Sequence, residues 1–281
     1  MDIGLIMFAT EATMPVVDVA REAEERGFES LFLPEHSHIP ARQQIERPKG
    51  GDLPEDYRYI FDPFVALAMV ASATCRLGLG TGICLAAQRD PIILAKTIAT
   101  LDVMSGGRVI LGVGAGWLTE EMENHGLDPR RRYQVLREHV QAMRAIWTSE
   151  VAEYHGDTVN FGPIWQWPKP FQRPHPPVLL GGTAPRMLDR VMTYADGWMP
   201  FAANGDDILA RDIRAVQAKA VSDGGEPLSI TVFGAAPDRA VLEQYREIGV
   251  RRCLLWLPPG PPEEVQRGLD SHAELLVKIR G

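Results

Sequence analysis

The chain has 281 residues, 45% of them hydrophobic and 23% charged, and its formal net charge is −8 at pH 7. This length suffices for one large buried core, and the composition is that of an ordinary globular protein. The acidic balance argues against nucleic acid as a partner, because binding to phosphates depends on Lys and Arg, and the absence of any apolar run of about 18 residues argues against a transmembrane helix.

The chain begins directly with a strand-like run at residues 2–8, and no basic segment typical of a signal peptide precedes it. The three cysteines, Cys75, Cys84 and Cys253, are scattered and form no C-x-x-C pair. This spacing argues against a disulfide framework and against a zinc site. These features predict a protein of the reducing cytoplasm.

Short apolar, β-branched runs alternate with longer helical patterns along the whole chain. The expected strands are 2–8, 29–33, 76–82, 108–113, 177–181, 197–201, 228–233 and 251–256. The expected helices are 15–26, 62–74, 91–104, 130–148, 184–195, 205–222, 237–248 and 262–279. Eight strands that are each followed by a helix indicate a parallel sheet. The count of eight favours an α/β fold of the (β/α)8 TIM-barrel type, formed by residues 1–281 as a single domain.

Two connecting segments are longer than a minimal barrel requires. Residues 39–61 follow the second strand and are rich in Pro and Gly, so they are expected on the face where barrel strands end, as a lid or a cofactor-contacting loop. The cations of this loop either meet an anionic ligand group or form a solvated charged surface; they are Arg42, Arg47, Lys49 and Arg58. Residues 151–176 follow the fourth helix and are expected to pack as an excursion on the surface.

Two neighbouring strands end in a near repeat, LGLGTG at 77–82 and LGVGAG at 111–116. Side chains alternate across a strand, so the three glycines of each run share one face. One interpretation is a flat space for a planar ligand, with Gly82, Gly114 and Gly116 among the contact residues. The other is interior packing, in which the glycines make room for bulky side chains from other strands.

Residues 178–185 have the pattern of a strand, a Gly-Gly turn and a helix start. Free N–H groups and the positive end of the helix dipole make such a start an anion site. Thr183 is a competent N-cap, and Pro185 suits the first helical turn. We therefore expect Gly181, Gly182 and Thr183 to hold a phosphate group; an ordinary capped turn is the alternative.

His36 lies directly after the second strand, where catalytic groups of a barrel gather. Histidine changes charge near neutral pH, so His36 is the candidate acid or base, with a structural or surface histidine as the alternative. His36 and His38 have no evident third ligand, and no metal is expected. Glu120 and Glu121 follow the second glycine run, where they touch a ligand, cap the next helix or face solvent.

Several motifs together resemble those of the luciferase-like oxidoreductases, and the resemblance covers nearly the whole chain. The first group of motifs is GTGI at 80–83, RDP at 89–91, AKTIATLD at 95–102, SGGR at 105–108 and GVGAGW at 112–117, followed by Glu121. The second group is PPVLLGG at 176–182 and ADGW at 195–198. The combination is specific for the family and poorly specific for the substrate.

The resemblance implies a TIM barrel that binds FMN or the deazaflavin coenzyme F420 at the ends of its strands. It places a non-prolyl cis peptide at Gly82–Ile83 or next to it, behind the cofactor ring, and a phosphate at Gly181–Thr183. It also pairs Glu35, as a cofactor contact, with His36. In related sugar-phosphate dehydrogenases a glutamate follows the glycine run, whereas this chain has Trp117 there, so that reaction is not expected.

The favoured hypothesis is an oxidoreductase that transfers a hydride between F420 and a small organic substrate. His36 is then the acid or base, and the cofactor contacts are Glu35, Gly82, Ile83, Gly114, Gly116, Trp117, Gly181, Gly182 and Thr183. The first alternative is a monooxygenase that uses reduced FMN and oxygen. The second is a flavin-binding barrel without turnover, or a non-redox phosphosugar enzyme. By analogy with the family, a homodimer is expected.

Overall fold

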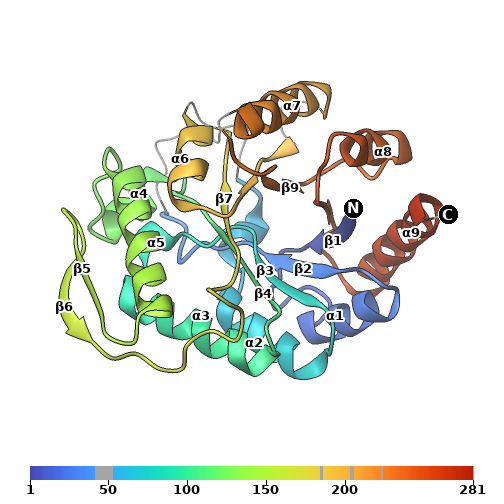
Figure 1. Ribbon diagram of the computed structural model, residues 1–281. Helices are drawn as coiled ribbons and strands as arrows, with labels where there is room; N and C mark the ends of the chain where they lie inside the picture. Colours follow the sequence, from blue (N-terminus) through green and yellow to red (C-terminus); the bar gives the residue numbers. More distant parts are fainter. Residues whose placement is uncertain (42–52, 184–185, 203–205, 223, 281) are drawn as a thin grey trace.

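A computed structural model describes residues 1–41, 53–183, 186–202, 206–222 and 224–280. Its parallel strands close into a barrel, which confirms the predicted fold (Figure 1). The barrel strands are β1 (Asp2–Ile6), β2 (Ser30–Leu33), β3 (Gly78–Thr81), β4 (Val109–Val113), β7 (Val178–Gly181), β8 (Gly197–Met199), β9 (Ser229–Phe233) and β10 (Arg252–Trp256). They neighbour one another in chain order, and β10 pairs with β1 to close the ring.

The helices surround the barrel. They are α1 (Val16–Glu25), α2 (Pro63–Ala73), α3 (Pro91–Ser105), α4 (Thr119–Asn124), α5 (Arg132–Thr148), α6 (Met187–Tyr194), α7 (Asp206–Ser222), α8 (Arg239–Glu247) and α9 (Pro262–Arg280). Two of the starts follow from an Asp-Pro pair. Asp62 accepts hydrogen bonds from the N–H groups of Phe64 and Val65 at 2.9 and 3.1 Å, and Asp90 caps α3 in the same way. A proline in the first turn loses no helical hydrogen bond, so these sequences define the helix boundaries closely.

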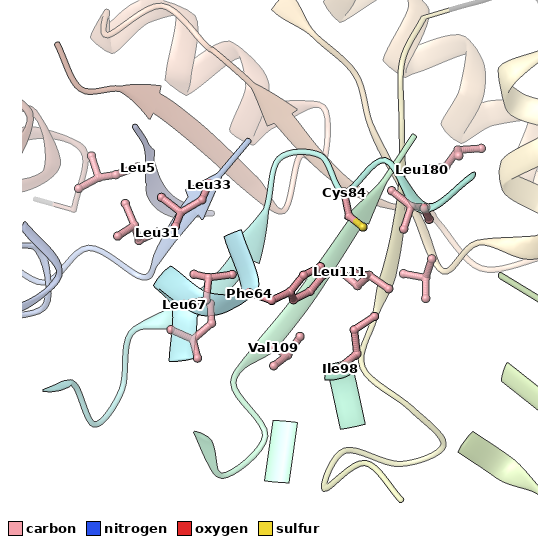
Figure 2. Close-up of a cluster of buried hydrophobic side chains, with 14 of the residues drawn as sticks. Leu5, Leu31, Leu33, Phe64, Leu67, Cys84, Ile98, Val109, Leu111 and Leu180 are labelled. Atoms are coloured by element: carbon pink, nitrogen blue, oxygen red, sulfur yellow. The ribbon is translucent and has the colours of Figure 1, made fainter. Parts of the chain in front are cut away.

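The main hydrophobic core lies between the strands and the helices. Alternate strand residues point outward to meet the helices, as the strand period of two requires. Figure 2 shows part of this layer; its labelled side chains are Leu5, Leu31, Leu33, Phe64, Leu67, Cys84, Ile98, Val109, Leu111 and Leu180.

A second, smaller core fills the inside of the barrel. Its buried members come from strands around the ring and are Ile6, Phe32, Ile110, Leu179, Met199 and Leu254. Ile83, Phe233 and Trp256 pack against it and are only partly buried. Side chains therefore fill the inside of the barrel. A ligand has room only at the carboxyl ends of the strands, here called the mouth of the barrel.

The segment 151–176 forms a surface excursion, as expected. It begins with an antiparallel pair, β5 (Ala152–His155) and β6 (Asn160–Ile164). The remainder returns along the outside of the barrel, where the Lys169 ammonium donates to the carbonyls of Ile146 and Ser149, each at 2.6 Å.

The loop expected at 39–61 is only partly described. Its described part contains a 3-10 turn, η1 (Glu55–Arg58), which places Tyr57 near the barrel mouth. Arg42, Arg47 and Lys49 lie outside the described residues, and Arg58 is exposed. No helix within the described ranges is long and apolar enough to cross a membrane.

Two features of the helical layer differ from the predictions. The short helix α4 was not predicted, because six residues leave little periodic signal. Helix α6 begins at Met187 rather than near residue 184, and its N-cap is Arg186, at φ 62°. Thr183 is therefore not the N-cap of that helix, which corrects the sequence prediction.

Candidate active site

His36 lies beyond the C-terminal end of β2, and its imidazole is 6% exposed. Its Nδ1 is 2.8 Å from Oε2 of Glu121 on α4, whose side chain is 1% exposed. The two residues are 85 positions apart in the chain. The barrel brings them together because both follow strands at the same mouth of the cylinder.

The Glu121 carboxylate is held by three hydrogen bonds. Besides His36, the Ser37 N–H and hydroxyl donate to its Oε1 at 2.8 and 3.1 Å. Burial alone raises the pKa of a carboxyl group, but the bonds from His36 and Ser37 outweigh it and lower the pKa of Glu121 below its ordinary value. Glu121 is therefore an anion at neutral pH, and we assign the Nδ1 proton of His36 to the bond between them.

The other ring nitrogen of His36, Nε2, has no hydrogen-bond partner among the described residues. An imidazole whose Nδ1–H is fixed by a carboxylate presents Nε2 as a proton acceptor. This arrangement suits proton transfer with a molecule at the mouth.

His38 is held away from a metal-binding geometry. Its Nδ1 is 2.9 Å from the Ser37 hydroxyl and its Nε2 is 2.8 Å from the Asn124 amide, so both ring nitrogens have protein partners. The Ser37 hydroxyl also meets Nε2 of His125 at 2.6 Å. Within the described ranges, no three His, Cys, Asp or Glu side chains gather as a metal site.

Glu35 is 5% exposed, and both of its carboxylate oxygens have protein partners. Oε2 accepts from the Leu85 N–H at 2.7 Å, and Oε1 accepts from Arg89, which also pairs with Asp62. These contacts fix the segment after β3 against the end of β2. The contacts of Glu35 with Leu85 and Arg89 stabilise the fold. The cofactor contact expected of Glu35 stays a prediction.

The glycines of the two runs as far as Gly82 and Gly114 face the barrel interior, as expected, but the space beside them is filled. Gly116 lies beyond β4, where a Cβ would meet Met122, Gln88 and Leu85. A Cβ added to Gly80 would lie 2.4 Å from the Phe32 ring, and one added to Gly112 would lie 2.2 Å from the Thr81 carbonyl oxygen. Gly82 faces Phe233 at 2.6 Å by the same measure. The interpretation of these runs as an open flat surface is therefore wrong, and interior packing explains them.

Ile83 forms the top of this interior packing. A Cβ on Gly114 would lie 1.9 Å from its Cδ1, and a Cβ on Gly181 would lie 2.7 Å from its Cγ2. The Gly82–Ile83 peptide is cis, as the family resemblance implied. Because Ile83 remains partly exposed, a planar ring at the mouth would rest on this side chain rather than on bare backbone. Cofactor contacts of Gly82, Ile83 and Gly114 stay predictions.

Aromatic rings form an arc around the mouth. Ring centroids lie 5.2 Å apart for Trp256 and Phe8, 4.8 Å for Phe8 and Tyr57, and 5.5 Å for Tyr57 and His36. Trp117 continues the arc, with its ring edge-on to His36 at 5.9 Å. Rings of this kind favour a planar aromatic ligand through stacking and edge contacts.

A cavity of about 220 Å³ lies between the segments that follow β2 and β3; its lining residues are Glu35, Ser37, Leu85, Gln88, Arg89 and His125. Both polar atoms of the Gln88 amide are buried and have no hydrogen-bond partner among the described residues. Its Nε2 would lie 3.2 Å from a Cβ on Gly116, a residue with φ 77°. An unpaired buried amide costs free energy that a hydrogen-bonding ligand can recover.

The Gly-Gly turn after β7 leads from the barrel toward α6. Gly182 has φ 118°, a conformation open to glycine alone, and its carbonyl accepts a hydrogen bond from the Trp198 indole at 2.8 Å. Thr183 is exposed. A phosphate contact at Gly181, Gly182 and Thr183 stays a prediction.

The residue that sequence reasoning missed is Glu121. It was noted only as a possible ligand contact or helix cap, because no local pattern links it to His36. The available signals were its position shortly after a barrel strand, where catalytic groups gather, and its place at the end of the family signature. Gln88 gave no sequence signal, since an unpaired amide is recognised only from its surroundings.

The closed barrel, its filled interior and the histidine at its mouth define an α/β-barrel protein with a candidate site at the carboxyl ends of its strands. The sequence profile of the family described as Luciferase-like monooxygenase matches residues 7–274. The chain belongs to this family, and the predicted family is confirmed.

Curated relatives differ in what is known of them. An uncharacterised protein of Mycobacterium tuberculosis is 41% identical over 98% of this chain and 99% of its own length. An F420-dependent glucose-6-phosphate dehydrogenase of Amycolatopsis mediterranei is 26% identical over 92% of this chain and 74% of its own. An FMNH2-dependent dimethylsulfone monooxygenase of Pseudomonas putida is 31% identical, over 55% of this chain and 45% of its own.

Solved structures share the fold. A monooxygenase from Streptomyces bottropensis, RslO1, aligns with a TM-score of 0.82 at 22% identity, over the whole of both chains. An F420-dependent secondary alcohol dehydrogenase aligns with a TM-score of 0.78 at 20% identity, over 100% of this chain and 99% of that one. The relatives thus include F420-dependent and FMN-dependent enzymes.

Proposed function

We propose that this protein is an F420-dependent oxidoreductase that transfers a hydride between the coenzyme and a small organic substrate. The observation that carries the proposal is the His36–Glu121 pair at the barrel mouth. Its Nε2, which has no hydrogen-bond partner among the described residues, and its position beside the aromatic arc suit one proton transfer to or from a molecule stacked there. F420, when bound, supplies or accepts the hydride at C5 of its deazaflavin ring.

The residues at the mouth fit such a ring. Ile83 presents an apolar surface on top of the interior packing. The rings of Tyr57 and Trp117 lie 5.5 and 5.9 Å from the His36 ring. The unpaired Gln88 amide offers a donor and an acceptor beside Gly116. We assign the ring to this space, with the cofactor phosphate at Gly181, Gly182 and Thr183.

His36 is the proposed acid or base, and Glu121 is a positioning residue. The ionised Glu121 holds the imidazole in one orientation and stabilises the imidazolium that forms when Nε2 accepts a proton. The surrounding aromatic rings limit the access of water. The chain's own chemistry is therefore orientation and one proton transfer.

The variant His36→Asn tests this assignment. It removes the titratable nitrogen but keeps a polar side chain of similar reach, so coenzyme affinity should stay while turnover falls by about 10²- to 10⁴-fold. The measurement is F420 fluorescence, for binding and for turnover. His155→Asn, an exposed histidine on β5, is the matched control. Unchanged turnover in His36→Asn would remove His36 from the mechanism.

We further infer that the protein is a homodimer that pairs through α2 and α3. Helix α2 contains no charged residue and is apolar on every side, a pattern of helices buried all round. Yet Val65 and Met69 on its outer face are 67% and 56% exposed, and the neighbouring α3 exposes Ile93 at 68% and Met104 at 74%. Exposed apolar side chains on two adjacent helices favour a protein interface, and a second copy presents the same side chains in return.

A further inference from the structure

One half of the barrel mouth is lined by four aromatic side chains. They lie at or just beyond the ends of four neighbouring strands, β1, β10, β9 and β8, and are Phe8, Trp256, Phe233 and Phe201. Inward side chains recur at every second residue of a strand. Phe8 and Trp256 each stand two residues beyond a member of the interior core, as Phe201 does. The rings therefore form the layer directly above that core.

The rings pack against one another in a continuous row. Ring centroids lie 5.4 Å apart for Trp256 and Phe233, and 5.6 Å apart for Phe233 and Phe201. Phe8 stacks on Trp256 at an interplanar angle of 28°. Tyr57 joins this row to His36. A planar group that lies on the row is therefore beside the proposed acid or base.

This layer differs from the layer below it in chemistry and in exposure. The side chains below are aliphatic, and Ile6, Leu254 and Met199 are 0%, 0% and 1% exposed. Phe8 and Trp256, like the other two rings of the layer, are only partly buried. Filling of the interior requires no ring with a face open to solvent. An apolar surface left open at the mouth is typical of a ligand-binding surface.

The opposite half of the mouth is built differently. There the glycines at 82, 114 and 181 surround Ile83, where the proposed function assigns the cofactor ring. Strand β2, which His36 follows, lies between β1 and β3 and so separates the two halves. A ligand on the aromatic half and a ring on Ile83 would meet beside His36.

The loops of the aromatic half have no cationic side chain. By sequence, no lysine or arginine occurs in the four segments that join these strands to their helices, 7–15, 200–205, 234–238 and 257–261. Their acidic residues are Glu11, which is exposed, and Asp238, which caps α8. Phosphates and carboxylates are bound chiefly by Arg and Lys. These loops therefore favour a neutral ligand.

We propose that the substrate is a neutral compound with a planar aromatic ring, which stacks on Trp256 and Phe8 and presents a carbonyl or hydroxyl oxygen to Nε2 of His36. This inference rests on the proposed function. Stacked and edge-to-face contacts between rings stabilise a complex beyond the burial of area alone. Aromatic ketones and the corresponding alcohols meet these requirements, whereas a sugar phosphate meets neither.

The test measures binding without turnover. Fluorine NMR titration is run with para-fluoroacetophenone, with the saturated analogue 4-fluorocyclohexyl methyl ketone and with the anion para-fluorobenzoate. Each is added to the protein alone and to the protein with oxidised F420, which cannot reduce a ketone. The variants are Phe8→Leu/Trp256→Leu, which keeps the layer apolar, and the control Trp165→Leu, at a surface site that is 77% exposed. F420 affinity is measured by fluorescence for each protein.

The wild type should bind the aromatic ketone at least about threefold more tightly than the saturated ketone and at least about tenfold more tightly than the anion. The double variant should bind the aromatic ketone about tenfold more weakly and lose the preference for an aromatic ring, while its F420 affinity stays. Trp165→Leu should behave as the wild type. If the double variant does not fold, Trp256→Leu alone should weaken the aromatic ketone about threefold.

Several results would overturn the inference and leave the proposed function standing. They are F420 binding by a wild type that does not bind the aromatic ketone, binds both ketones equally or prefers the anion, and a double variant that binds the aromatic ketone as Trp165→Leu does. An equal loss of F420 and ketone in the double variant would contradict the division of the mouth into two halves. A wild type that binds the aromatic ketone but not F420 would instead overturn the proposed function.

Discussion

The Glu121 carboxylate holds His36 in its orientation. His36 follows β2, whereas Glu121 lies on α4, which follows β4. The pair shows how little of the proposed chemistry is local. His36 offers Nε2 to the mouth only while Glu121 is ionised, since a protonated carboxyl group no longer favours the Nδ1–H bond to the same extent. The charge of Glu121 therefore helps to hold His36 in the orientation that offers Nε2.

The sign of the resulting pH dependence follows from the lowered pKa of Glu121. A carboxyl group whose pKa is lower in the folded state stabilises that state above its unfolded pKa, and this contribution is lost as the pH falls through the folded pKa. Acidification should therefore weaken the fold around α4 and lower kcat/KM together.

Glu121→Gln separates these effects. The variant cannot ionise, so we expect kcat to fall on the order of 10²-fold and the acid limb that Glu121 contributes to the pH profile to disappear. The profile of kcat/KM against pH is the measurement, and Glu120→Gln is the control on the same helix. An acid limb that persists unchanged in Glu121→Gln would show that another group controls it.

At the scale of the elements, β3 and β4 show where sequence reasoning succeeded and where it failed. Alternation correctly placed their glycines on one face. It did not reveal what lies opposite, because Phe32, Phe233 and Met199 come from other strands. A glycine pattern made by distant bulky side chains is identical, in one sequence, to a pattern made by a ligand.

The substitution Gly112→Ala tests interior packing. Its Cβ would lie 2.2 Å from the Thr81 carbonyl oxygen and 2.4 Å from Cε of Met199, and the backbone of a neighbouring strand moves only at a cost. We expect a loss of about 1–3 kcal/mol or more in the free energy of unfolding.

Gly162→Ala on β6 is the matched control, because a Cβ there meets nothing within 4 Å. Its free energy of unfolding should be unchanged or higher by up to about 1 kcal/mol. Denaturant unfolding of both variants is the measurement. Equal stability of the two variants would contradict the packing account.

Helix and strand order were predictable because the barrel repeats one local pattern, an apolar strand and then a helix with its own start and stop residues. Asp62 and Asp90, each followed by proline, define their helix starts within a residue. The prediction of Thr183 as an N-cap was wrong because threonine also suits an ordinary loop. The N-cap of α6 is Arg186. The catalytic pairing was not predictable, since His36 and Glu121 meet only through barrel closure.

At the scale of the whole molecule, the exposed apolar face of α2 and α3 predicts self-association. The charged substitutions Met69→Glu and Ile93→Glu should together convert a dimer into a monomer, because each buries a carboxylate at an apolar contact. Val277→Glu on α9, at a site that is 72% exposed, is the control. Light scattering after gel filtration gives the mass. A wild type with the mass of one chain would contradict the inferred interface.

The central claim is that the mouth of this barrel binds a deazaflavin ring beside His36. Equilibrium titration of the purified wild type with F420 and with FMN tests it most directly. We expect saturable binding of F420, with an affinity at least about tenfold higher than that for FMN. Tight binding of FMN without binding of F420 would contradict it and would identify an FMN-dependent monooxygenase, and binding of neither would point to a non-redox barrel.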